Sequence, residues 1–130
     1  MAALDTDILV SLLKGVPDAV EKVRELQESG SPISTTMITA YELLKGAYIS
    51  SRPQENLSKV SDIISNLKVL ELSFGAAEEA ARTHKDLRDR GRLIGEFDVL
   101  IAAIVMFYDE ALVTRDAHFK TIRGIKLIKW

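Results

Sequence analysis

Four acidic residues are scattered along the chain at positions where their carboxylates could act together: Asp5, Glu42, Asp98 and Asp116. Ions of the magnesium type are held by a few carboxylates and keep several waters. Such an ion can activate a water and stabilise charge on a phosphoryl group, which is the chemistry of phosphodiester hydrolysis. The chain has no cysteine and only two histidines. A metal site would therefore depend on oxygen ligands, which favours Mg²⁺ or Mn²⁺.

The most informative stretch is residues 95–107, where Gly95 and two acids open a run that stays apolar for nine residues. A helix that is apolar on every side belongs in the interior of a domain. Asp98 shares a helical face with Ile101 and Val105, so we expect its carboxylate to turn inward at the edge of the core. Glu96 lies roughly opposite on an ideal helix, so we prefer Asp98 as the ligand.

Each acid also has a simpler explanation. Asp98 could complete a helix start, where carboxylates suit the positive end of the helix dipole. Asp5 could cap the helix that follows it, and Asp116 could begin a turn. Glu42 could be a surface acid paired with Lys45 or Lys14. Only their placement in a fold can favour a shared site.

Short apolar segments alternate with segments of helical periodicity along the whole chain. We predict strands at residues 2–4, 33–35, 68–72, 111–114 and 126–128, and helices at about 8–13, from 17, and at 36–49, 53–67, 74–89 and 95–107. This alternation is typical of an α/β protein, a three-layer α/β/α sandwich with a central, mainly parallel sheet. Sites in such sheets lie beyond the carboxyl ends of the strands, where Asp5 and Asp116 fall. The order of the strands stays open.

The bulk properties limit the classes of function. A chain of 130 residues predicts one domain, residues 1–130. Its net charge of −2 gives no overall basic field for nucleic acid, although a local patch could serve. We find no signal peptide and no apolar run near the ~20 residues that span a bilayer, so we expect a cytoplasmic protein that uses no membrane.

Four segments, taken in order, resemble the motifs of the PIN domain family, specifically the VapC-type toxins of toxin–antitoxin pairs. The segments are Leu4–Leu9 with Asp5, Ser34–Gly46 with Glu42, Ile94–Ala103 with Asp98, and Leu112–Phe119 with Asp116. The terminal Trp130 also fits the family. Single motifs of this kind are permissive, but four in series with family-like spacing are specific.

The resemblance implies an α/β/α nuclease that cleaves RNA with Mg²⁺ or Mn²⁺. Asp5 and Asp98 would be the principal metal ligands. Glu42 would be a ligand or would position the attacking water. Asp116 would be a ligand directly or through water, and Thr114 would supply a supporting hydroxyl. The family also implies a homodimer and a cognate antitoxin that blocks the site.

Contacts with the substrate are less clearly marked. Arg115 stands beside Asp116 and could hold a phosphate with two donors. Further basic residues could form a rim, although each is most simply a solvated surface charge: Lys14, Lys45, Arg52, Arg90 and Arg92. We expect the aromatic residues on the helices to make core or dimer contacts rather than to stack on bases: Tyr41, Tyr48, Phe107 and Tyr108. His118 is a poor candidate for a catalytic base. We expect it to lie in a capped turn or at an exposed position instead.

Two other functions stay open at this stage. A PIN-fold module could bind RNA or a partner without cutting, but all four acids are present. Alternatively, Asp5 and Asp7 after a strand are similar to the nucleophile motif of haloacid-dehalogenase-like phosphatases, in which Asp5 would attack phosphorus and Asp7 would act as acid and base. The lysine usual in that family has no clear counterpart here.

Four clustered carboxylates without a cation should repel one another, so the pKa of some of them should be raised.

Overall fold

A computed structural model describes residues 1–130 and has a parallel sheet of five short strands at its centre. The strands are β1 (Ala2–Leu4), β2 (Ile33–Thr36), β3 (Lys68–Leu70), β4 (Ala111–Val113) and β5 (Lys126–Ile128). Their order across the sheet is β3-β2-β1-β4-β5, and every neighbouring pair is parallel. The first strand therefore lies in the middle, with β2 on one side and β4 on the other.

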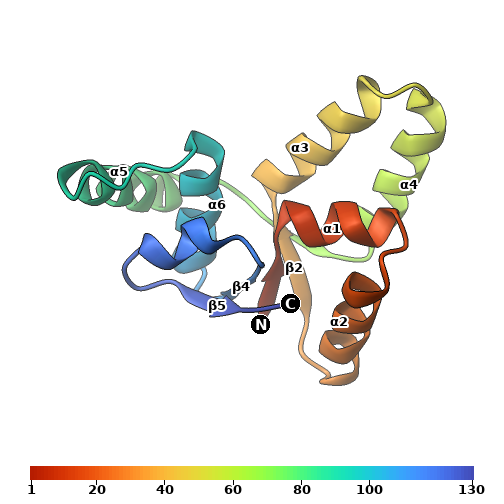
Figure 1. Ribbon diagram of the computed structural model, residues 1–130, viewed down its shortest axis with the longest axis horizontal. Helices are drawn as coiled ribbons and strands as arrows, with labels where there is room; N and C mark the ends of the chain where they lie inside the picture. Colours follow the sequence, from red (N-terminus) through yellow and green to blue (C-terminus); the bar gives the residue numbers. More distant parts are fainter.

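Helices cover both faces of this sheet, which confirms the predicted three-layer α/β/α architecture (Figure 1). The helices are α1 (Thr6–Leu13), α2 (Pro17–Glu28), α3 (Met37–Tyr48), α4 (Pro53–Ser65), α5 (Phe74–Asp89) and α6 (Glu96–Phe107), and a short 3₁₀ helix, η1 (Ala117–Thr121), follows β4. One apolar cluster joins α1 to α4 with the sheet, and a second joins α5, α6 and η1 with its other face.

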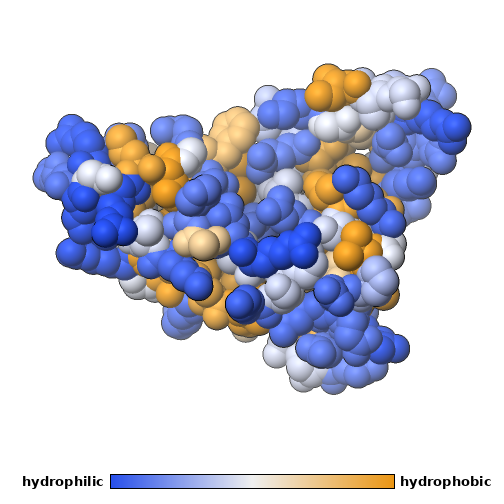
Figure 2. All heavy atoms as spheres, viewed as in Figure 1, coloured by the Kyte–Doolittle hydropathy of each residue, from blue (hydrophilic) through white to orange (hydrophobic).

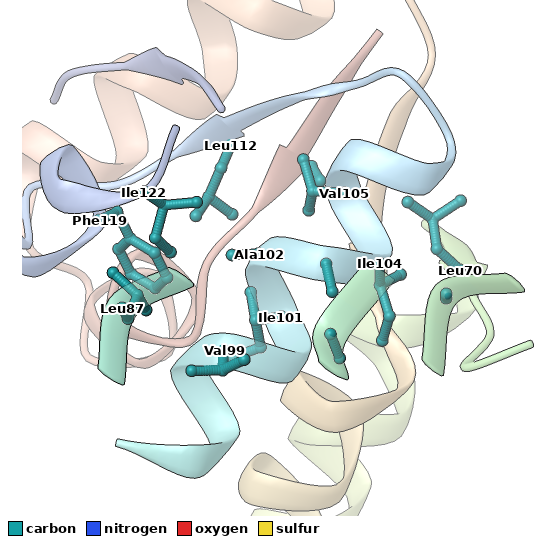
Figure 3. Packing of buried hydrophobic residues seen from close by; sticks show 14 residues of the cluster. Leu70, Leu87, Val99, Ile101, Ala102, Ile104, Val105, Leu112, Phe119 and Ile122 are labelled. Atoms are coloured by element: carbon teal, nitrogen blue, oxygen red, sulfur yellow. The ribbon is translucent and has the colours of Figure 1, made fainter. Parts of the chain in front are cut away.

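The second cluster is built around α6. Ile101, Ala102, Ile104 and Val105 are all at most 1% exposed, and Figure 3 shows them in one apolar cluster with Leu112 of β4 and Leu87 of α5. Complete burial of one such Ile or Val contributes about 1.5–3 kcal/mol. The continuous apolar run in the sequence thus marks the helix that both α5 and the sheet cover.

The structure corrects two details. The predicted strand at 68–72 ends at Leu70 because its partner β2 ends at Thr36, the residue paired with Leu70, and the chain then turns into α3. Tyr41, Tyr48 and Phe107 are 50%, 67% and 47% exposed, so core packing was the wrong expectation for these three rings.

No helix combines the length and the apolarity that a membrane crossing requires.

Candidate functional site

The acidic residues gather at the carboxyl edge of the sheet. Asp5 follows β1 directly, and its backbone N–H donates to the carbonyl of Val113 at the end of β4, at 3.1 Å. Asp116 comes three residues after Val113 and caps η1. Because β1 and β4 are parallel neighbours, Leu4 pairs with Val113 and the two strand ends lie side by side. The topology therefore places Asp5 and Asp116 at one edge, as predicted.

Thr114 connects these two acids. Its hydroxyl donates to Asp5 Oδ2 at 2.8 Å and accepts from the backbone N–H of Asp116 at 3.0 Å. The other oxygen of the Asp5 carboxylate, Oδ1, accepts from the backbone N–H of Thr6 at 2.7 Å. Thr114 is 4% exposed and so is Asp5, so this set of bonds lies out of solvent. Asp5 is thus both the cap of α1 and a member of the cluster, and the two explanations do not compete.

Glu42 reaches the same place from α3. It accepts a hydrogen bond at Oε1 from the hydroxyl of Thr6 at 2.8 Å. That hydroxyl also lies 3.1 Å from Oγ1 of Thr39, one turn earlier on α3. Glu42 forms no ion pair, so the surface pairing with Lys45 or Lys14 is not what this structure contains. Instead Thr6 ties Glu42 to the residue that follows Asp5.

Asp98 enters from the first turn of α6 and differs from the other acids, since its half-buried carboxylate accepts no hydrogen bond and forms no ion pair. The start of the helix, at Gly95, carries no side-chain cap. Asp98, Asp116 and His118 each offer one ligand atom, and these atoms all lie within 4.8 Å of one another. Such spacing suits a single cation.

The electrostatics agree with a cluster of acids. Burial raises the pKa of Asp5 to about 6 from 3.8, against the hydrogen bonds from Thr114 and Thr6, and the charges of Asp7 and Asp98 raise it further. Burial also raises the pKa of Asp98, followed by the charges of Asp116 and Glu42. The predicted rise is therefore confirmed for two acids, but desolvation is its larger cause and repulsion the smaller.

Two residues of the site went unrecognised in the sequence. Thr6 is an ordinary helix-start residue by its local pattern, and only the fold shows that it holds Glu42. His118 is exposed, as expected, but its Nδ1 lies 3.0 Å from Asp116 Oδ1, which also accepts from the backbone N–H of His118 at 2.9 Å. A histidine two residues after the last acid was the only available signal.

The predicted basic rim is only partly available. Arg52 is paired with Glu55, and Arg90 with Asp86. The remaining candidates form no ion pair: Lys14, Lys45, Arg92 and Arg115. The ammonium of Lys45 lies 5.2 Å from the ring centre of Tyr41 and 5.4 Å from that of Phe97, next to Asp98 in the chain. The guanidinium of Arg115 lies over the ring of Trp130.

The donor set fits a hard divalent cation. The site offers carboxylate oxygens from four elements of the fold, one imidazole at its margin, and no thiolate. One carboxylate, Asp98, has no partner in the protein, and burial raises the pKa of another, Asp5. Mg²⁺ and Mn²⁺ are the ions that such oxygen ligands favour.

Comparison with known proteins places this geometry in a family. The sequence profile of the PIN domain matches residues 2–125. The chain is 31% identical to a tRNA(fMet)-specific endonuclease VapC of Salmonella typhimurium and 29% identical to that of Shigella flexneri, each over 98% of this chain and 96% of the relative.

Solved structures agree with the sequence match. VapBC2 from Rickettsia felis bound to a promoter DNA fragment superposes with a TM-score of 0.91 at 28% identity, covering 99% of this chain and 98% of that one. DNA-bound VapBC from Salmonella typhimurium superposes with a TM-score of 0.91 at 29% identity, covering 99% of this chain and 97% of that one. The chain therefore belongs to the PIN domain family and groups there with the VapC ribonucleases.

Proposed function

We propose that this protein is a metal-dependent endoribonuclease, a VapC-type toxin that cuts RNA phosphodiester bonds as one nuclease domain. The observation that carries the proposal is the meeting of Asp5, Glu42, Asp98 and Asp116 at one edge of the sheet, with Asp98 unpartnered. The ribonuclease activity named for the VapC relatives supports the same substrate class.

The division of labour follows from the hydrogen bonds. Asp98 and Asp116 would hold Mg²⁺ or Mn²⁺ together with Asp5, whose position the Thr114 hydroxyl fixes. The bound ion would supply a more acidic water and a positive charge beside the phosphoryl oxygens. Glu42, oriented by Thr6 through one oxygen, keeps its second oxygen to hold the attacking water or to complete the ligand set.

Binding of an RNA strand requires cations near these acids. Arg115 is exposed, stands next to Asp116 and has no partner carboxylate, so its donors are available to a phosphate. Its single positive charge beside the cluster would offset part of the repulsion between the acids and the RNA backbone.

A cognate antitoxin is the second proposed partner. The matched solved structures from Rickettsia and Salmonella are VapBC assemblies. In this chain an open cavity of about 490 Å³ lies between α1, α3 and α4, and Figure 2 shows apolar atoms in it. Leu13, Leu43 and Val60 line the cavity, and Glu42 lies at its border. An apolar antitoxin segment seated there would reach the acids and block them.

A homodimer is the third proposed association. Helix α3 exposes a row of large apolar side chains at helical spacing: Met37, Tyr41, Leu44 and Tyr48, which are 43%, 50%, 38% and 67% exposed. Exposed apolar side chains gathered along one helix face are typical of a protein–protein contact. The dimer prediction for Tyr41 and Tyr48 therefore stays in place, whereas the core prediction does not.

The alternative functions have less support. The phosphatase would need Asp7 to work beside Asp5, but Asp7 is exposed and forms no hydrogen bond. A module that binds without cutting would need no intact acid cluster, whereas all four acids are in place here. Neither alternative accounts for the unpartnered carboxylate of Asp98.

The first test is calorimetric titration of Mn²⁺ into chelator-treated protein, beside Asp98→Asn and the control Asp62→Asn on the exposed face of α4. We expect saturable binding in the wild type and the control that is lost in Asp98→Asn. Cleavage of total RNA in Mn²⁺ should follow the same pattern. Equal binding by all three proteins would overturn the proposal, and Asp98 would then be explained only as an acid that stabilises the start of its helix.

A further inference from the structure

Arg115 and Trp130 form a cross-strand pair at the carboxyl edge of the sheet. Val113 of β4 is paired with Ile128 of β5, and the N–H of Thr114 still donates to the carbonyl of Ile128 at 3.0 Å. The same parallel register, continued by two residues beyond Val113, sets Arg115 beside Trp130. The Cζ atom of Arg115 lies 4.0 Å from the centre of the indole ring, which is a cation–π contact.

The guanidinium of Arg115 is free of other protein partners. Six other arginines each pair with an aspartate or glutamate: Arg24, Arg52, Arg82, Arg88, Arg90 and Arg123. Arg115 forms no ion pair and no hydrogen bond, although it is exposed and directly precedes Asp116. Its one contact is with the indole ring, so its N–H donors remain available to a ligand.

This arrangement has a specific electrostatic consequence. A flexible arginine beside four carboxylates would be expected to pair with one of them, as Arg90 does with Asp86. Such a pair would remove the cation from RNA and a ligand from the metal. The hydroxyl of Thr114 donates to Asp5, whereas the guanidinium of the next residue, Arg115, lies over the indole of Trp130 and forms no ion pair with an acid.

The ring itself is anchored. Trp130 packs, partly buried, against the apolar cluster beneath α1 that includes Val113, and its Nε1 is buried without a hydrogen-bond partner. A buried donor with no acceptor is costly, and indole N–H groups usually find one. The position of this ring is therefore set by packing and by the arginine above it, and no hydrogen bond of its own contributes.

We propose that Trp130 is a positioning residue of the RNA site, which holds the guanidinium of Arg115 away from the acids and ready to bind a backbone phosphate. The proposal rests on the proposed function and adds to it a residue that touches neither the metal ligands nor the RNA. It predicts that Trp130 affects RNA binding only through Arg115.

The test is a double-mutant cycle on RNA binding. A fluorescently labelled, single-stranded RNA oligonucleotide is titrated with wild type, Arg115→Gln, Trp130→Leu and the double variant, with anisotropy as the readout and chelator present to prevent cleavage. The control Arg24→Gln removes one cation from an ion pair on α2. Each titration is repeated at several salt concentrations, because a lost phosphate contact lowers the salt dependence by about one unit of slope.

We expect Arg115→Gln to weaken binding by about tenfold, as loss of a charge-assisted bidentate contact does. Trp130→Leu should weaken binding by about two- to fivefold, the size of an exposed cation–π contact, with a reduced salt slope. In the Arg115→Gln background, Trp130→Leu should change nothing, and Trp130→Phe should retain most of the wild-type affinity. Arg24→Gln should retain the wild-type salt slope.

Two outcomes would overturn the inference alone: RNA binding unchanged in Arg115→Gln, or equal weakening by Trp130→Leu with and without the arginine, which indicates a purely structural ring. Wild-type protein that binds no RNA in chelator would also overturn the inference, whereas the Mn²⁺ titration and the cleavage of total RNA test the proposed function separately. Since Trp130 is the only tryptophan, its own fluorescence gives a second readout, which should change when RNA is added to the wild type and not to Arg115→Gln.

Discussion

Replacing Asp5 by asparagine should stabilise the metal-free protein at alkaline pH. Burial raises the pKa of this carboxyl from 3.8 to about 6. Each unit of pKa difference between folded and unfolded states is worth about 1.4 kcal/mol, so ionised Asp5 costs the fold about 3 kcal/mol well above pH 6. Because Asp5 is 4% exposed, solvent screens little of this cost. Asparagine removes the charge and can still accept from the N–H of Thr6.

The sign of the pH dependence follows from the raised pKa. The folded state holds the proton more tightly than the unfolded chain, so the contribution to stability is complete below about pH 4 and is lost as pH rises through about 6. When the pH is lowered from 8 to 5, protonation of Asp5 alone should increase the free energy of unfolding by about 1.4 kcal/mol. Asp98, whose pKa is also raised, should change stability in the same direction.

Urea unfolding in chelator at pH 8 and pH 5 measures these quantities. At pH 8, Asp5→Asn should be more stable than wild type by about 1–3 kcal/mol, and its stability should depend less on pH. The control Asp62→Asn, at an exposed position of α4, should follow the wild type. An Asp5→Asn protein less stable than wild type at pH 8 would refute the reasoning, because capping of α1 by the charged group would then outweigh its desolvation.

Four further outcomes follow from the same structure. Mn²⁺ should raise the melting temperature of wild type but not of Asp98→Asn, whose metal-free form should be as stable as wild type or slightly more so; differential scanning fluorimetry measures both. Thr114→Val removes a buried hydroxyl that binds two groups, so urea unfolding should show a loss of about 1–3 kcal/mol and RNA cleavage should fall by tenfold or more. Tyr48→Glu should shift sedimentation toward the monomer if α3 forms the dimer contact, while cleavage chemistry persists. Leu112→Ala, in the fully buried layer beneath α6, should cost about 2–5 kcal/mol in urea unfolding.

The sequence was sufficient to predict the layers and the edge of the sheet at which the acids meet. The α6 segment is apolar all round because both α5 and the sheet cover it, and that burial is directly visible in composition. The positions of Asp5 and Asp116 follow from a general property of parallel sheets, whose carboxyl ends share one edge. Neither inference needs the order of the strands.

The family resemblance named Thr114 as a supporting hydroxyl, but the order of the strands, the role of Thr6 and the partners of both hydroxyls could not be predicted from local sequence patterns. Four of the five strands have only three residues, so their pairing depends on how the helices pack and not on the strands' own patterns. The bonds from Thr6 to Glu42 and from Thr114 to Asp5 join groups 36 and 109 residues apart. Such contacts have no local signature, because any threonine at a strand or helix end has the same neighbours in sequence.

From the sequence alone, an acid such as Asp5 or Asp116 could either cap a helix or take part in a catalytic site. In the structure the two roles are compatible. A carboxylate has two oxygens: Asp5 uses one for the N–H of Thr6 and the other for Thr114, and Asp116 uses one for His118. Of the four clustered acids, Asp98 alone has both oxygens free of protein partners, so no capping bond is lost when it is replaced. Substitution of Asp98 therefore separates metal binding from folding, whereas substitution of Asp5 changes both, and a comparison of these two asparagine variants assigns each effect to its cause.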